Sequence, residues 1–176
     1  MRVLDPGFDS REVFGLVVSA PRAALLLDYD GTLAPFTPQR ERAFPYPGVR
    51  EAIARISGEG WTRLAIVSGR AIADLAPLLG VDALPELWGS HGLEHRTARG
   101  DLVAAPASPA LLGWIDAAAA WVEGQEWGHL LERKPYGLAL HARGTGAAEF
   151  RLARDGLLRR WGRQAEEAGL ESLGFD

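Results

Sequence analysis

The sequence contains no cysteine, which excludes a disulfide framework and a thiolate metal site. No Lys/Arg-rich run stands out and the formal net charge is -4, so nucleic acid is a poor candidate partner. No stretch approaches the ~20 apolar residues that a membrane-spanning helix needs. The apolar segment Val13 to Val18 is too short for a signal peptide, and Asp5, Asp9 and Glu12 precede it in place of a basic region. We therefore expect a cytoplasmic protein.

The chain holds 176 residues, of which 47% are apolar and 24% charged, so it can form one domain or two small ones. Short apolar runs alternate with helical periodicities in its first half, which predicts an α/β fold with a parallel sheet built from βαβ units. From about residue 94, two strand-rich segments are each followed by a helix, which predicts an α+β insert. We expect strands near 23–27, 63–67, 84–88, 94–97, 101–103, 130–134 and 137–143, and helices near 9–19, 48–58, 72–79, 109–123 and 145–168.

Two carboxylates follow the first expected strand, where the apolar run Ala23 to Leu27 ends in Asp28-Tyr29-Asp30-Gly31. A short apolar run bounded by a turn residue predicts a strand buried on both faces. Side chains alternate along a strand, so Asp28 and Asp30 share a side if the extension persists. Ligands of open α/β sheets bind beyond the carboxyl ends of the strands, and a cation there would offset the repulsion between two acids. A solvated turn is the alternative interpretation.

The full string from Asp28 to Leu33, D-Y-D-G-T-L, resembles motif I of the haloacid dehalogenase (HAD) phosphatase superfamily. The resemblance implies that Asp28 is a nucleophile that becomes an aspartyl phosphate and that Asp30 is the general acid/base. It also implies that Asp28 and Asp30 hold Mg²⁺. The chemistry suits these residues, because a carboxylate that attacks phosphorus divides one difficult hydrolysis into two easier steps, while magnesium neutralises charge on the phosphoryl oxygens.

Ser68-Gly69-Arg70 follows the second expected strand. Ser68 could cap the next helix, and the N-terminus of that helix would itself attract an anion. Together with the motif at Asp28, the segment resembles HAD motif II, in which the hydroxyl binds a phosphate oxygen. The resemblance implies a phosphate-binding role for Ser68, Gly69 and Arg70.

Two later segments narrow the resemblance. The first is Gly89 to Glu94, G-S-H-G-L-E, and the second is Glu132 to Arg143, which fits the pattern E-x-K-x-x-x-x-x-x-H-x-R. Both segments resemble those of the trehalose-6-phosphate phosphatase family, in which the second belongs to the cap. The resemblance implies that a cap domain closes over the active site and that His91, Glu132, Lys134 and His141 face the sugar phosphate. The residues alone leave two other interpretations open, which are a loop histidine with satisfied hydrogen bonds and a solvated amphipathic strand.

The sequence departs from the HAD pattern after the cap, where that pattern has a lysine (motif III) and an acidic pair (motif IV). We find neither, because Lys134 belongs to the cap and Asp176 follows a cap-like stretch. The resemblance therefore implies a partial Rossmann-like core at 1–93 and an α+β cap at 94–176. The apolar edge beside the Asp28 strand would then be unpaired. We expect a second copy or a complementing chain to cover it, unless the chain is a truncated gene product.

These observations favour a Mg²⁺-dependent sugar-phosphate phosphatase. The first alternative is a catalytically inactive homologue that binds a sugar phosphate or a complementing chain. The second is a phosphatase or mutase for another phosphosugar.

Overall fold

The helices and strands form where the apolar periodicity of the sequence predicts them, with boundaries that shift by a few residues. The computed structural model describes residues 9–37, 39–142 and 144–173, so Arg143 and Asp176 lie outside the described residues. Short 3-10 helices, η1 to η3, separate some of the longer elements. The elements in order are α1 (Ser10–Ser19), β1 (Ala23–Asp28), η1 (Arg40–Arg42), α2 (Val49–Glu59), β2 (Thr62–Val67), α3 (Ile72–Leu79), β3 (Glu86–Gly89), η2 (Ser90–Gly92), β4 (Glu94–Arg96), β5 (Leu102–Ala104), α4 (Pro109–Glu123), η3 (Gly128–Leu130), β6 (Leu131–Lys134), β7 (Gly137–Leu140) and α5 (Ala147–Glu167).

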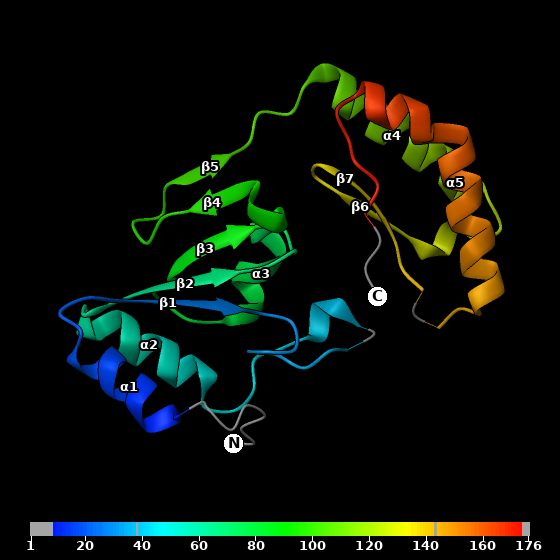
Figure 1. Cartoon of the computed structure of the whole chain (residues 1–176). Helices are drawn as coiled ribbons and strands as arrows, with labels where there is room; N and C mark the ends of the chain where they lie inside the picture. The colour runs from blue at the N-terminus through cyan, green and yellow to red at the C-terminus, as the bar shows by residue number, and fades with distance from the viewer. Residues whose placement is uncertain (1–8, 38, 143, 174–176) are drawn as a thin grey trace.

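A five-stranded sheet of order β1-β2-β3-β4-β5 forms the first part of the structure (Figure 1). β1, β2 and β3 are parallel, as expected for βαβ units, whereas β4 and β5 are antiparallel additions, so the sheet is mixed. This confirms the predicted α/β class. The hairpin β4–β5 was expected in the insert, but it pairs with β3 and extends the first sheet. The division after residue 93 stays a prediction, and the sheet itself continues to Ala104.

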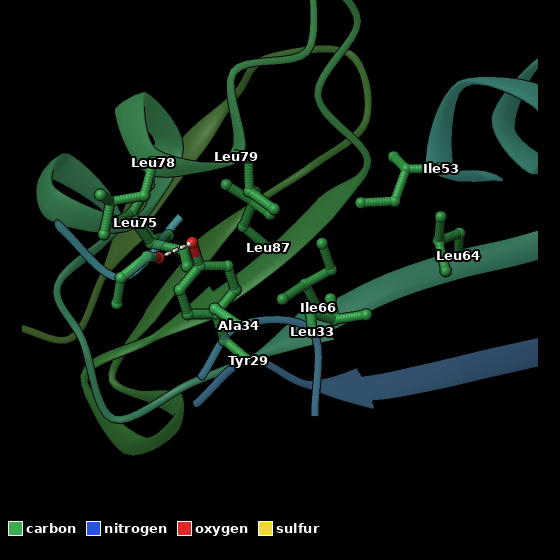
Figure 2. Packing of buried hydrophobic residues seen from close by; sticks show 12 residues of the cluster. Tyr29, Leu33, Ala34, Ile53, Leu64, Ile66, Leu75, Leu78, Leu79 and Leu87 are labelled. Atoms are coloured by element: carbon green, nitrogen blue, oxygen red, sulfur yellow. Dashed lines mark hydrogen bonds between the residues drawn. The ribbon is translucent and has the colours of Figure 1, made fainter. Parts of the chain in front are cut away.

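One face of this sheet carries the main hydrophobic cluster, shown in Figure 2. Leu64 and Ile66 of β2 meet Ile53 from α2 and Leu75 from α3, so both crossover helices cover the same face. Tyr29, directly after β1, is fully buried in this cluster, and its hydroxyl donates to the carbonyl of Ala43 at 2.6 Å. The cluster therefore anchors the chain at the carboxyl end of β1, where the acids lie.

β1 is at the edge of the sheet, and among the described strands it pairs only with β2. Its side chains alternate between half-buried and exposed, and Leu26 is 65% exposed. The prediction that this strand is buried on both faces is therefore wrong, because α2 and α3 cover one face only. α1 is also exposed along residues 11–19, including five large apolar side chains: Val13, Phe14, Leu16, Val17 and Val18.

The second part of the structure is an α+β unit, in which α4 packs against α5 and against the hairpin β6–β7 (Figure 1). Its own cluster includes Val122, Trp127, Leu130 and Ala153. α4 begins where the sequence predicts, because the Ser108 hydroxyl accepts from the backbone N–H of Leu111 at 3.1 Å. Of the residues expected to face the sugar, Glu132 and Lys134 lie on β6 and His141 directly follows β7, whereas His91 lies in η2. None of the described helices is long and apolar enough to cross a membrane.

Candidate active site

A tight turn follows β1 and positions both acids. The backbone N–H groups of Leu33 and Ala34 donate to the carbonyl of Tyr29, and Gly31 N–H donates to the carbonyl of Ala34 at 2.7 Å. Gly31 adopts φ +85°, which is costly for any residue with a Cβ, and a Cβ there would lie 2.4 Å from the Phe36 ring. The turn therefore requires glycine at this position.

The two carboxylates have different surroundings. Asp28 is exposed, Tyr29 is buried and Asp30 is half-buried, so the alternation of the strand continues into the turn. The Asp28 carboxylate makes no hydrogen bond or ion pair with any described residue. Asp30 instead accepts two hydrogen bonds from the Arg70 guanidinium, at 2.8 and 2.7 Å. Among the described residues, one acid thus has no charged or hydrogen-bonding partner, and the other is paired with a cation.

Arg70 is a buried cation, and each of its three guanidinium nitrogens donates a hydrogen bond. Its side chain is only 4% exposed, and its Nη1 donates to the carbonyl of Arg40 at 2.8 Å. The hydrogen bonds to Asp30 raise the pKa of Arg70 further above its ordinary value, although burial opposes this. Burial also raises the pKa of Tyr29 to about 12, because desolvation outweighs the positive charge of Arg70 above its ring. The predicted phosphate-binding role of Arg70 would require it to exchange part of its contact with Asp30.

The alternative role of Ser68 as the cap of α3 is wrong. The Ser68 hydroxyl accepts from the backbone N–H of Arg70 at 3.1 Å, and α3 begins only at Ile72 without a capping side chain next to it in sequence. The carboxylate of Glu94 caps the helix instead, accepting from Ile72 N–H at 3.0 Å and from the Ser90 hydroxyl at 2.8 Å. An acid at this helix N-terminus opposes a second anion there. The Ser68-Gly69-Arg70 loop itself stays the predicted phosphate site.

His91 lies over the Ser68–Arg70 loop in a strained backbone. Ser90 and His91 adopt φ +49° and +57°, a region that non-glycine residues rarely occupy. A Cβ on Gly69 would meet the His91 ring at 2.6 Å, so glycine allows the imidazole to approach. Burial, and next the charge of Lys134, lower the pKa of His91, which favours the neutral ring. The structure thus brings His91 against the predicted phosphate loop.

The hairpin β6–β7 brings its predicted residues to the same place. Lys134 Nζ donates to the carbonyl of Gly69 at 3.4 Å. His141 Nε2 hydrogen bonds to one oxygen of Glu132, and the Arg40 guanidinium pairs with the other. Burial would raise the pKa of Glu132, but the hydrogen bonds from Arg40 and His141 hold it below the ordinary value. Glu132 is therefore a carboxylate held from two sides.

A cavity of about 150 Å³ lies between these elements. Four of the predicted site residues do not line this cavity: Asp28, Ser68, His91 and Glu132. Asp28 nevertheless lies near the phosphate loop, because it pairs with Val67, which precedes Ser68. Sequence reasoning missed Arg40, because nothing in the Q-R-E-R run separates it from Arg42. The lining residues are Asp30, Arg40, Gly69, Arg70, Lys134 and His141.

The acids fit Mg²⁺ only in part. The free Asp28 carboxylate and the backbone carbonyl of Asp30 are oxygen ligands of the kind that Mg²⁺ accepts, and Mg²⁺ often keeps several waters. The Asp30 carboxylate does not fit as a ligand, because Arg70 neutralises it. Across the described part of the chain, no group of three or more acidic, histidine or cysteine side chains could hold a metal ion.

Comparisons with known proteins agree with these motifs. The trehalose-phosphatase family model matches residues 26–158. The trehalose-phosphate phosphatases of Mycobacterium leprae and Mycobacterium ulcerans are 32% and 33% identical over 142 and 164 residues, which cover 77% and 85% of this chain. The same matches cover 32% and 41% of those proteins, so the chain spans about a third to two fifths of their length.

Solved structures show the same fold. The C-terminal domain of a C. albicans trehalose-6-phosphate phosphatase has a TM-score of 0.72 at 20% identity, covering 92% of this chain and 57% of its own. A trehalose-6-phosphate phosphatase related protein has a TM-score of 0.66 at 24% identity, covering 88% and 65%.

Proposed function

The chain belongs to the trehalose-phosphatase family, and on that premise we propose that it carries the nucleophile, general acid and sugar-reading residues of a trehalose 6-phosphate phosphatase. The observation that carries the proposal is the Asp28 carboxylate, exposed and without a partner among the described residues, at the carboxyl end of β1. The register of β1 with β2 places it beside the predicted phosphate loop. A free carboxylate next to an anion-binding loop is the arrangement that phosphoryl transfer to an aspartate requires.

In the proposed reaction, an oxygen of Asp28 attacks phosphorus while the bond from phosphorus to the sugar oxygen breaks, which leaves an aspartyl phosphate. Asp30 gives a proton to the departing sugar oxygen and then accepts one from the water that hydrolyses the aspartyl phosphate. Bound Mg²⁺ would supply neutralising charge to the phosphoryl oxygens. The Asp30 carboxylate accepts two hydrogen bonds from Arg70, so this contact must loosen before Asp30 can reach the sugar oxygen.

Recognition of the substrate falls to the loop after β2 and to the hairpin β6–β7. The Ser68 hydroxyl and the backbone of Gly69 would hold the phosphate, with Lys134 close to the same loop. Glu132 and His141 would accept and donate hydrogen bonds to sugar hydroxyls. Such half-buried polar groups give specificity, because a ligand that leaves them unpaired binds poorly.

An inactive homologue that binds a sugar phosphate is the second candidate. The observation that favours it is the neutralised Asp30 carboxylate, together with the small acid set of the described residues. A phosphatase or mutase for another phosphosugar would use the same core residues, and a panel of sugar phosphates separates these activities.

The test is phosphate release from trehalose 6-phosphate with Mg²⁺, comparing the natural chain with Asp28→Asn. Turnover that the substitution abolishes, without a change in thermal stability, supports the phosphatase. Binding of trehalose 6-phosphate without turnover would instead support the inactive homologue. Faster turnover of another sugar phosphate would indicate that this other ester, and not trehalose 6-phosphate, is the substrate.

We further propose that a second polypeptide, either another copy or a complementing chain, covers the open edge of β1. The exposed Leu26 and the exposed apolar side chains of α1 support this. Sedimentation of the purified chain tests it, because a stable monodisperse monomer would count against both partners.

A further inference from the structure

The two parts of the structure touch only slightly. Their hydrophobic clusters are separate, and no described helix or strand between 109 and 167 packs broadly against the five-stranded sheet (Figure 1). The contact above the cavity is polar, and it includes the ion pair of Arg40 with Glu132 and the hydrogen bond from Lys134 to Gly69. A single ion pair can therefore matter more here than on an ordinary surface.

Arg40 is well placed to act across this contact. Its carbonyl accepts from the buried Arg70 at 2.8 Å, and the N–H of Ala43 closes the turn of η1 by donating to the same carbonyl at 3.3 Å. The backbone of Arg40 is thus tied to the loop that also holds Asp30. Its side chain is 31% exposed, and its guanidinium reaches the other part of the structure.

Glu132 receives this guanidinium at one oxygen and His141 at the other. Its side chain is 24% exposed, and it lies on β6 two residues before Lys134. Two donors on two oxygens fix the plane of a carboxylate, whereas one donor leaves it free to rotate. Removing Arg40 would leave Glu132 oriented by His141 alone.

We propose that Arg40 is a positioning residue, which fixes the Glu132 carboxylate and holds the hairpin β6–β7 over the cavity. Glu132 and Lys134 then meet a sugar phosphate in one arrangement, which reduces the ordering that binding requires. The role toward the sugar phosphate rests on the proposed function. The bridge that Arg40 and Glu132 form between the two parts of the structure does not rest on the proposed function, and a separate experiment tests it.

Arg42 offers a matched control. It lies in the same 3-10 helix, carries the same charge and is exposed, but its Nη1 donates to Gln39 Oε1 at 2.9 Å and not to Glu132. Arg42→Ala therefore removes the same charge from the loop without touching the bridge. Arg40→Lys keeps the charge but loses the planar geometry of the guanidinium.

The first experiment measures the distance between the two parts. Because the sequence has no cysteine, spin labels at Arg55→Cys in α2 and Arg151→Cys in α5, both exposed positions, report on one pair of sites by pulsed electron double resonance. We expect Arg40→Ala to lengthen and broaden the distance distribution, Glu132→Gln to do the same, and Arg42→Ala to leave it unchanged. An Arg40→Ala distribution identical to that of the parent would overturn the proposal.

The second experiment measures substrate discrimination. We expect Arg40→Ala to raise KM for trehalose 6-phosphate about tenfold, the effect of one charged hydrogen bond. We expect a smaller loss of kcat/KM for 4-nitrophenyl phosphate, because that ester has no sugar to meet Glu132. Arg40→Lys should recover part of the loss. Equal losses on both esters would refute positioning. If the natural chain hydrolyses neither ester, the proposed phosphatase activity fails, and the distance measurement still decides the role of Arg40.

Discussion

The buried carboxylate of Glu86 gives a prediction that unfolding measurements test without any assay of activity. This carboxylate, at the start of β3, is 6% exposed and accepts hydrogen bonds from Arg63 at 2.7 and 2.9 Å, from Trp88 Nε1 at 3.0 Å and from His95 Nε2 at 2.9 Å. The His95 ring also stacks on Trp88, with ring centroids 4.0 Å apart. The bonds from Arg63 lower the pKa of Glu86 from 4.5 to about 2, although burial opposes them.

A group with a lowered pKa in the folded state stabilises that state above its ordinary pKa and loses this contribution as the pH falls through the folded value. For Glu86 the window runs from 4.5 down to about 2. The full displacement is equivalent to about 3.4 kcal/mol. Arg63 is 71% exposed, so solvent screens the pair, and we expect about 1–2 kcal/mol.

The assay is urea unfolding followed by tryptophan fluorescence at several pH values. Glu86→Gln should lower the free energy of unfolding by about 1–2 kcal/mol at pH 7 and by almost nothing at pH 2. Glu59→Gln, at an exposed position at the end of α2, is the control and should follow the natural protein at every pH. If Glu86→Gln kept the full loss of stability between pH 4.5 and 2, the reasoning would be wrong.

Three further substitutions test the turn after β1. Gly31→Ala should lower the free energy of unfolding by about 1–3 kcal/mol, since φ +85° and the adjacent aromatic ring both oppose a Cβ; an unchanged melting temperature would contradict this. Tyr29→Phe removes the buried hydrogen bond to Ala43 and should lower the free energy of unfolding in urea by about 1–2 kcal/mol, and high pH should not restore the lost stability. Arg70→Met leaves Asp30 without its cation and should lower the free energy of unfolding by about 2–4 kcal/mol. Adding Asp30→Asn to the same chain should restore stability, which would identify the unpaired charge as the cause.

Most helices and strands could be predicted from local sequence patterns. The apolar run before Asp28 and the turn signal at Gly31 predict a strand and its end, because both depend on neighbouring residues only. Pro109 after Ser108 likewise marks the start of α4. The exposure of β1 could not be predicted from this pattern, because an apolar run such as Ala23 to Leu27 occurs both in central strands and in edge strands.

The sequence motifs include every residue that lines the cavity except Arg40, but they do not predict which residues pair with one another. The motifs named Asp30, Arg70 and Glu132, yet no spacing indicates that Arg70 holds Asp30 or that Arg40 reaches Glu132. These partners come from segments that meet only in the folded chain. The capping of α3 by Glu94 was missed for the same reason, since its acceptor lies 22 positions away from the N–H of Ile72.

The open edge of β1 divides its amide protons into two populations. Successive residues of a strand point their N–H groups to opposite sides, so alternate amides of Ala23–Asp28 donate to β2 and the others face outward. Hydrogen–deuterium exchange should therefore show a slow, fast, slow pattern at single-residue resolution along this strand. Any strand that joins the edge would convert the fast amides to slow ones, which makes β1 a built-in reporter of what binds beside Asp28.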